Sequence, residues 1–466
     1  MKQYMKLAAC FLLGVGIWFA PHPEEINSQA WHLFSIFSAT ISLILLQALP
    51  MGAATLSGIT FTILTKTMTF DAAFSGYKSA VPWLILIAFF IARGFIKTGL
   101  GSRVAYGFIS ILGKKTLGLA YGLMLTDLAL APAIPSLTAR TGGVLFPIVK
   151  SLANAFDSSP DNGTQRRVGA YLIMSVFQCT VVSASMFLTA MAANPLVVNF
   201  GEQIGAEVTW GNWALAASVP GGLSLIIIPA ILYQIYPPEL KDTPDAINMA
   251  KEKLNEMGSM SRDEIDMTIG FLSVLVLWIF GKQIGIGAAP AALLCLVFLL
   301  VTSVLTWDEL LRIPGAWDTF IWFGALIAMA GGLKDFGLTV WFGKYIAAQF
   351  SDVSTEVGFL SLLLIYYYVH YFFASSVAHV GALCLPLMTA AVDLGAPPVA
   401  TVLAFGVASN LYGALTHYGC GPAPILYGAG FVTLGEWWFY GFVMGLVNIA
   451  VWVTVGTFWW KTIGIL

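Results

Sequence analysis

The sequence predicts an all-α polytopic membrane protein with about eleven transmembrane helices and two re-entrant hairpins, arranged as an inverted repeat. Hydrophobic residues make up 58% of the 466-residue chain and charged residues only 10%, against roughly 25% in ordinary soluble domains. Apolar runs long enough to cross a bilayer recur from one end to the other. Two segments, 136–148 and 375–387, follow one pattern, which indicates internal duplication.

The remaining composition excludes several classes of protein. The net charge is −2, so no strong basic field indicates nucleic acid as a partner. The five cysteines are scattered, without disulfide or metal-ligand spacing, and neither a cofactor nor a metal site is expected. Lys2 and Lys6 followed by an apolar run could mimic a signal peptide, but no small-residue cleavage site follows. We therefore expect a retained first helix.

Hydropathy, together with the proline, glycine and polar residues between apolar runs, places the elements in order. Short amphipathic pieces are expected at 101–113 and 339–350, hairpins within 117–152 and 356–390, and the only long polar stretch, 237–266, joins the halves. Full spans are expected near 6–21, 31–49, 52–66, 79–97, 167–200, 211–236, 267–281, 286–305, 317–335, 396–430 and 435–462.

The first hairpin is predicted from the length and the breakers of its segment. Segment 117–152 is too long for one span, and it contains Pro132, Pro135 and Pro147 besides two glycines. Proline removes a backbone donor and disfavours helix at the residue before it. Irregular backbone at membrane depth must be buried in protein or line a cavity. A helix–turn–helix hairpin with its tip at 136–138 fits; the alternative is a pair of kinked helices.

The duplication has further landmarks. Ser136–Ile148 (SLTARTGGVLFPI) and Ser375–Leu387 (SSVAHVGALCLPL) share a Ser, a basic residue (Arg140 or His379), a Gly, and a Pro eleven positions after the Ser. Segment 94–100 matches 332–338, and 188–195 matches 415–422 in the same order. The odd number of spans between the copies predicts that they are inverted. Basic clusters at 103, 114–115 and 166–167 place the N-terminus and the 237–266 loop in the cytoplasm.

The two tips favour a site for a small dianion. Helix N-termini favour anions, and a charged group in an apolar segment is a functional-site hypothesis by default. Two alike tips suit a dicarboxylate, whose two ends are alike. Alternatives remain: the serines could simply cap helices, Arg140 could pair with a lipid headgroup or a carbonyl, and a single histidine is more often structural. The candidate substrate-binding residues are Ser136, Leu137, Thr138, Arg140, Thr189, Asn194, Pro195, Ser375, Ser376, Val377, His379, Thr416, His417, Gly421 and Pro422.

Longer motifs resemble a known family. Segments 93–105 (RGFIKTGLGSRVA), 131–147 (APAIPSLTARTGGVLFP) and 370–382 (HYFFASSVAHVGA) are similar to the divalent anion/sodium symporter family, and most similar to its branch of plastid 2-oxoglutarate/malate translocators and bacterial dicarboxylate and citrate antiporters. The resemblance covers essentially the whole chain. It implies a homodimer in the bacterial inner membrane, in which a transport domain moves against a scaffold in an elevator motion.

That resemblance implies an assignment of segments to the two domains. Residues 1–100 and 201–338 would be scaffold helices, the latter with the cytoplasmic loop 237–266. Residues 101–200 and 339–430 would be the transport parts, each with one hairpin and one broken helix, and 431–466 the last transmembrane helix.

Both tips depart from the family, the first at one position of its triplet and the second at two. Sodium-coupled members resemble one another in a Ser-Asn-Thr triplet at each tip, whereas here the triplets are Ser136-Leu137-Thr138 and Ser375-Ser376-Val377. Without the asparagines, we expect fixed groups to hold the dianion and the empty carrier to cross slowly. The sequence thus predicts sodium-independent exchange of dicarboxylates resembling 2-oxoglutarate, malate and succinate. Sodium- or proton-coupled symport of dicarboxylate or citrate, a channel and a membrane-embedded enzyme are the alternatives.

Overall fold

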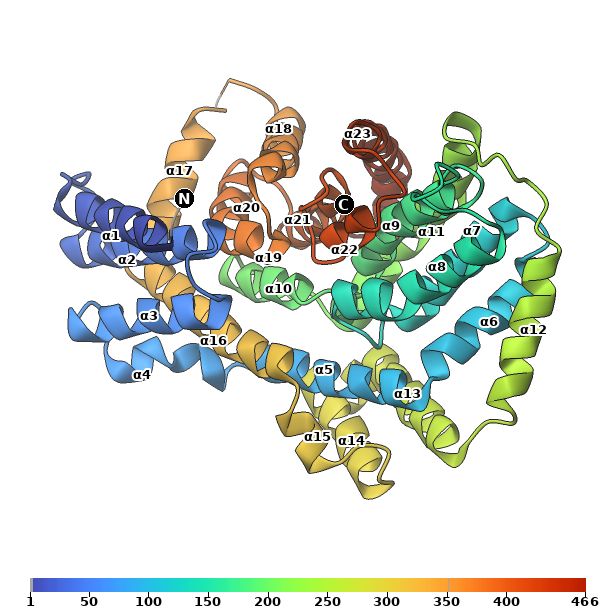
Figure 1. The fold of residues 1–466 in the computed structure, drawn as a ribbon. Helices are drawn as coiled ribbons and strands as arrows, with labels where there is room; N and C mark the ends of the chain where they lie inside the picture. Colours follow the sequence, from blue (N-terminus) through green and yellow to red (C-terminus); the bar gives the residue numbers. More distant parts are fainter. Residues whose placement is uncertain (1–2, 351) are drawn as a thin grey trace. The chain divides into compact units, whose positions relative to one another are not determined.

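The computed structural model describes residues 3–350 and 352–466, apart from the side chain of Lys282. All regular elements in these ranges are helices, and they contain no β-strand (Figure 1). The chain divides into two compact units. Unit 1 holds Met1–Leu86, Pro195–Val208 and Arg312–Ala408; unit 2 holds Ile87–Asn194, Thr209–Leu311 and Ser409–Leu466.

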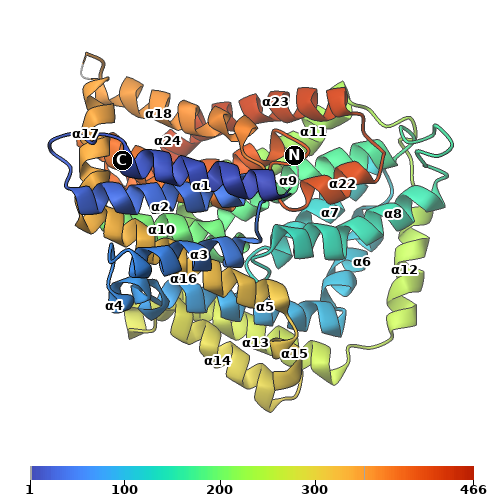
Figure 2. The same cartoon turned by 60° about the vertical axis from the view of Figure 1, so that its left-hand side comes forward.

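Unit 1 begins with α1 and α2, which lie side by side (Figure 2). Close approach at Gly14 allows this, because its carbonyl accepts a hydrogen bond from Ser35 Oγ at 2.6 Å. The long helix α16 packs against α3, and α17 packs against α20. The bounds in this unit are α1 (Gln3–Phe19), α2 (Ser28–Leu45), α3 (Met51–Leu64), α4 (Phe70–Ala73), η1 (Ser75–Lys78), α16 (Pro314–Asp335), α17 (Leu338–Ala348), α18 (Thr355–Val369), η5 (His370–Phe372), α19 (Ser376–His379), η6 (Val380–Cys384) and α20 (Leu385–Asp393).

Unit 2 is built around α9, which is buried along its whole length. Helices α7, α8 and α11 pack on it, and α13 packs on α14. The bounds in this unit are α6 (Leu100–Leu112), α7 (Thr116–Leu130), η2 (Thr138–Leu145), α8 (Phe146–Ala155), α9 (Gly169–Met186), η3 (Leu188–Ala190), α11 (Trp210–Ile235), α12 (Asp245–Met257), α13 (Arg262–Phe280), η4 (Gly281–Ile284), α14 (Ala288–Val301), α15 (Trp307–Leu311), η7 (Tyr412–Ala414), α22 (Ala423–Gly428), α23 (Leu434–Val451), η8 (Trp452–Gly456) and α24 (Thr457–Thr462).

Three helices carry the chain from one unit into the other: α5 (Ala80–Thr98), α10 (Ala193–Gln203) and α21 (Pro398–Leu411). Two of these crossings fall within the spans that the sequence predicts to be broken. Each unit therefore contains one hairpin and one half of each broken span.

The predicted fold class is confirmed, and every predicted span has a helix at its place. Seven helices in the described ranges are long and apolar enough to cross a membrane by length and composition. The shorter apolar helices α1, α3, α14 and α21 fill four of the other predicted positions, and α13 lies at the predicted span 267–281. The two predicted amphipathic pieces are α6 and α17.

Both predicted hairpins are helix–turn–helix structures. In each, a π-helix follows the tip: η2 in the first copy and η6 in the second. The shared prolines, Pro147 and Pro386, stand in the first turns of α8 and α20. A proline cannot donate the ordinary intrahelical hydrogen bond, and a wider turn is a common accommodation. In the first copy the Phe146 N–H bonds to the Thr141 carbonyl, five residues back.

A second landmark of the repeat is confirmed in the backbone. Gly99 and Gly337 occupy the same place in the matched segments 94–100 and 332–338, with φ of 76° and 85°. Both lie in the left-handed region, where glycine has no Cβ clash, and each precedes an amphipathic helix. The sequence expected segment 237–266 as a charged loop; it also contains the helix α12, which packs against α6.

Candidate functional site

The first tip, residues 136–138, turns the chain between α7 and η2. Ser136 Oγ accepts a hydrogen bond from the Ala139 N–H at 3.2 Å, which is the geometry of a helix N-cap. The Leu137 side chain is buried, 7% exposed, whereas Ser136 is half-buried and Thr138 exposed. The capping alternative for the serine is thus observed, and Thr138 is the tip side chain most open to solvent.

Arg140, one turn past the tip, is fully buried and fully engaged. Its Nε donates to Asp127 Oδ1 at 2.7 Å. Its Nη1 donates to the carbonyls of Ile134 at 2.9 Å and Ala190 at 3.0 Å, and its Nη2 to the Thr180 carbonyl at 3.5 Å. Arg140 therefore ties together α7, the hairpin turn, α9 and the break after α9.

Asp127 is the residue that sequence reasoning missed. It is 1% exposed on α7, and besides Arg140 it accepts hydrogen bonds from Thr180 Oγ1 at 3.1 Å and Ser183 Oγ at 2.6 Å. Thr180 Oγ1 also bonds Thr141 Oγ1 at 2.7 Å. A lone aspartate within an apolar span was the available signal. We name Asp127, Arg140, Thr141, Thr180 and Ser183 the arginine cluster.

The break after α9 is fixed by two predicted residues. Thr189 Oγ1 donates to the Pro132 carbonyl at 2.7 Å and accepts from Trp210 Nε1 at 3.0 Å. Asn194 Nδ2 donates to the carbonyls of Ala184 at 2.9 Å and Phe187 at 3.0 Å. Helix ends leave backbone carbonyls without intrahelical partners, so Asn194 caps α9 across its own break.

The second broken span reaches the first tip within unit 2. A Cβ on Gly421 would collide with Thr138 Oγ1, so a larger residue at 421 would displace the Thr138 hydroxyl. Pro422 is buried beside it. Thr416 is fully buried, and its Oγ1 has no hydrogen-bond partner among the described residues. His417 is half-buried, and its Nδ1 accepts from Trp438 Nε1 at 3.1 Å.

Asn194 also connects the two broken spans. Its Oδ1 accepts a hydrogen bond from Asn410 Nδ2 at 2.7 Å, and both side chains are buried in unit 2. Asn410 is a second contributor that the sequence reasoning missed. Pro195, which follows Asn194, is buried and belongs to unit 1.

The second tip, residues 375–377, lies in unit 1 and repeats the local design. Ser375 Oγ accepts a hydrogen bond from the Ala378 N–H at 3.3 Å, as Ser136 does in the first copy. Ser375 and Val377 are half-buried, and Ser376 is buried. The expectation that both tips meet at one anion stays a prediction, as do the substrate contacts of every predicted site residue.

His379 occupies the place that Arg140 has in the first copy. It is fully buried, and its Nδ1 lies 3.0 Å from Nδ1 of His370. Its ring packs against Tyr366 and Phe373 at centroid distances of 4.5 and 4.4 Å. At most one proton lies between the two facing nitrogens. The matched positions therefore differ: an ion pair in one copy and a histidine pair among aromatic rings in the other.

Within the described residues, no group of three or more His, Cys, Asp or Glu side chains is placed to hold a metal ion. Hydroxyl and carbonyl oxygens, which hard cations prefer as ligands, do not belong to those four side-chain types.

The whole chain, residues 1–466, matches the family described as the sodium:sulfate symporter transmembrane region. It is 49% identical over 462 residues to dicarboxylate transporter 1, chloroplastic, of Spinacia oleracea, which covers 98% of this chain and 81% of that protein. The putative malate transporter YflS of Bacillus subtilis is 49% identical over 454 residues, covering 97% and 95%. The inner membrane protein YbhI of Escherichia coli is 34% identical over 469 residues, covering 99% and 98%.

A solved structure has the same fold. The YdaH transporter of Alcanivorax borkumensis matches with a TM-score of 0.60 at 14% identity, covering 99% of this chain and 97% of that one. Fold, hairpins and whole-length relatives agree, and the family consists of transporters rather than enzymes. The chain therefore belongs to the sodium:sulfate symporter family, the divalent anion/sodium symporters, and is a multi-pass membrane transporter.

Proposed function

We propose that this protein exchanges C4 and C5 dicarboxylates, such as 2-oxoglutarate, malate and succinate, across the bacterial inner membrane without sodium. Relatives that match nearly the whole chain are named as a dicarboxylate transporter and a putative malate transporter. We further propose a homodimer with elevator motion and a cytoplasmic N-terminus, as the family resemblance implies.

The first tip has groups suited to one carboxylate. Thr138 offers an exposed hydroxyl, and the N-terminus of η2 presents backbone N–H groups at the same point. Exposed N–H groups at a helix start favour anions. Gly421 keeps the backbone of the second broken span against Thr138. We expect the second tip to hold the other carboxylate through Ser375 and Ser376.

The exchange mode rests on one observation, the triplet composition. Leu137 stands where sodium-coupled members resemble one another in an asparagine, and its side chain is buried. An aliphatic side chain offers no oxygen to a cation, which needs several oxygen ligands. Ser376 stands at the matching position of the second triplet, and the apolar Val377 stands where those members have a threonine. Because no co-transported cation binds at the tips, we expect the empty carrier to keep hydrogen-bond donors that have no partner.

The arginine cluster changes which groups would make the empty carrier slow to cross the membrane. Asp127 neutralises Arg140 at 2.7 Å, so we assign Arg140 the role of positioning the tip instead of compensating a dianion. The unpaired groups of the empty site, such as the Thr416 hydroxyl, cost about 1–3 kcal/mol each. A loss of about 1.4 kcal/mol that arises only during the crossing is enough to slow the empty carrier tenfold.

Reconstituted vesicles test this proposal. Vesicles loaded with malate should take up labelled 2-oxoglutarate at least tenfold faster than empty vesicles, with or without sodium. A panel of unlabelled acids, including citrate, would rank the substrates by counterflow. Uptake into empty vesicles driven by a sodium gradient would refute exchange.

Cation-coupled symport is the second candidate, and the arginine cluster favours it specifically. Because Arg140 brings no net charge with Asp127 beside it, a dianion at the first tip would gain from a sodium ion or a proton. Backbone carbonyls at the tip turn could supply the ligands that Leu137 lacks. Uptake into empty vesicles driven by a proton gradient would identify the proton-coupled form.

A further inference from the structure

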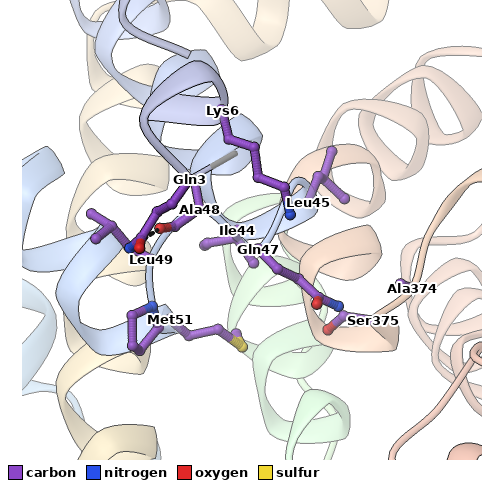
Figure 3. A pocket seen from close by; sticks show the side chains of 11 residues that line it. Gln3, Lys6, Ile44, Leu45, Gln47, Ala48, Leu49, Met51, Ala374 and Ser375 are labelled. Atoms are coloured by element: carbon purple, nitrogen blue, oxygen red, sulfur yellow. Dashed lines mark hydrogen bonds between the residues drawn. The ribbon is translucent and has the colours of Figure 1, made fainter. Parts of the chain in front are cut away.

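A cavity of about 630 Å³ lies in unit 1 beside the second tip (Figure 3). Gln3 and Lys6 of α1, Gln47 of the turn between α2 and α3, and Ser375 of the tip line it. The other lining residues are apolar, and no described lining residue carries a carboxylate. Ligand pockets typically measure ~300–1,000 Å³, so the cavity has room for a small anion with its hydration water.

The polar groups of this cavity are mainly donors. Lys6 is half-buried and contributes the one positive charge of the described lining. Ser375 Oγ accepts the Ala378 N–H at 3.3 Å, which leaves its own proton to donate. Gln3 Nε2 donates to the Ala48 carbonyl at 3.3 Å and so ties α1 to the turn. An ammonium, a hydroxyl and an amide around one cavity form a surface that attracts a carboxylate.

The turn that carries Gln47 aims its side chain at the tip. Gln47 has φ of 50°, in the left-handed region. Its N–H donates to the Ile44 carbonyl at 3.0 Å and the Ala48 N–H donates to the Leu43 carbonyl at 2.9 Å, which closes α2. The Gln47 side chain extends towards Ser375 (Figure 3). Glycine adopts this φ more readily than glutamine, so Gln47→Gly removes the amide without straining the turn.

We propose that this cavity is an anion vestibule in which Lys6 holds a carboxylate of the incoming dicarboxylate before it reaches Ser375. The inference rests on the proposed function for the identity of its anion. It goes beyond that function because it assigns a capture site to α1, which carries no part of either hairpin. Since Lys6 lies at the start of α1, the vestibule serves the face of the membrane on which the N-terminus lies.

The first test measures KM and the maximal rate of Lys6 variants that differ in charge, separately on the two faces of the membrane. Lys6→Gln should raise KM on the N-terminal face about five- to tenfold, which corresponds to about 1–1.4 kcal/mol. The maximal rate and the KM on the opposite face should stay at the wild-type values. Lys6→Arg should keep most of the affinity. Lys66→Gln is the matched control, because it removes the same charge from an exposed turn with φ of 58° outside the cavity.

The second test restores the charge chemically, and one of its two readouts needs no flux. The native cysteines are all buried, so Lys6→Cys provides an accessible thiol. Reaction with 2-aminoethyl methanethiosulfonate should restore affinity, and the sulfonatoethyl reagent should lower it further. Malate should slow the modification of the thiol, even in a preparation that shows no transport.

The outcomes separate the two proposals. An unchanged KM in Lys6→Gln, an equal loss in Lys66→Gln, or no protection by malate would overturn the vestibule. Absence of exchange in the wild-type protein with protection intact would overturn the proposed function and leave the vestibule standing. Gln47→Gly should raise KM on the same face without lowering the melting temperature, and a wild-type KM there would remove the amide from the site.

Discussion

Breaking the ion pair of the arginine cluster should collapse the first tip. The perturbation is Arg140→Ala, which leaves the carboxylate of Asp127 buried at 1% exposure. Asp127 would retain only the hydroxyl bonds from Thr180 and Ser183. The carbonyls of Ile134 and Ala190, now bonded at 2.9 and 3.0 Å, would also lose their donor.

The magnitude follows from these contacts. Removing one partner of a buried ion pair costs about 3–5 kcal/mol, because the other charge stays buried without compensation. Arg140→Ala should therefore lower thermal stability clearly and abolish exchange, while enough protein folds to be purified. Asp127→Asn should cost a similar amount, since it leaves the Arg140 guanidinium buried without a counter-charge. Its single amide oxygen can replace only one of the two carboxylate oxygens that now accept from Thr180 and Ser183. The double variant Arg140→Met with Asp127→Leu should recover stability but not exchange.

The assay combines thermal unfolding in detergent with exchange in vesicles. Arg140→Lys separates the effect of charge from that of geometry. A lysine keeps the positive charge, but it lacks the planar guanidinium with which Arg140 bonds a carboxylate and two carbonyls at once. We expect it to lose most activity. Wild-type exchange in Arg140→Ala, or strictly additive losses in the double variant, would refute the positioning role of the pair.

Two further predictions address unit 2. Gly421→Ala should reduce exchange at least tenfold with little loss of thermal stability, because its Cβ would displace the exposed Thr138 hydroxyl. Gly428→Ala, with open space around its Cβ, should behave as wild type in both assays. Glu264→Gln should cost about 1–3 kcal/mol at neutral pH, since Arg103 Nε donates to Glu264 at 2.6 Å. Burial alone would raise the pKa of Glu264, but hydrogen bonds from Arg103 and the neighbouring cap hold it below its usual 4.5. The ion pair therefore stabilises the fold above that value, and the deficit of the variant should fade as the pH falls through the lowered pKa; a deficit that does not shrink at all on acidification would contradict the ion-pair assignment.

Much of the fold could be predicted because membrane sequences encode it locally. A bilayer demands long apolar helices, so hydropathy located each span. Proline and glycine located the interruptions, since Pro147 and Pro386 follow π-helices and Gly99 and Gly337 adopt left-handed φ. Segment 237–266 was less predictable. Its helix α12 depends on packing against α6 as well as on its own charged sequence.

The candidate site was predictable in its members but not in their partners. Thr138 and Gly421 were both named from the sequence and do lie together. Thr189 and Asn194, also named, donate to backbone carbonyls, Thr189 to Pro132 of the first hairpin and Asn194 to the end of α9. Carbonyl partners leave no trace in residue type, so no pattern reveals them.

By itself, the sequence determined that the protein lies in a membrane and the order of its spans and hairpins, because both follow from apolar length and helix-breaking residues. It also determined the duplication, which follows from the repeated residue pattern. Only the tertiary structure decided what the buried charges do. Arg140 looked like a free cation because Asp127, thirteen residues earlier, lies on another helix. His379 looked like its equivalent, yet it packs against His370 and aromatic rings. The cost of a buried charge depends on its neighbours in space, and those neighbours are set by the packing of helices.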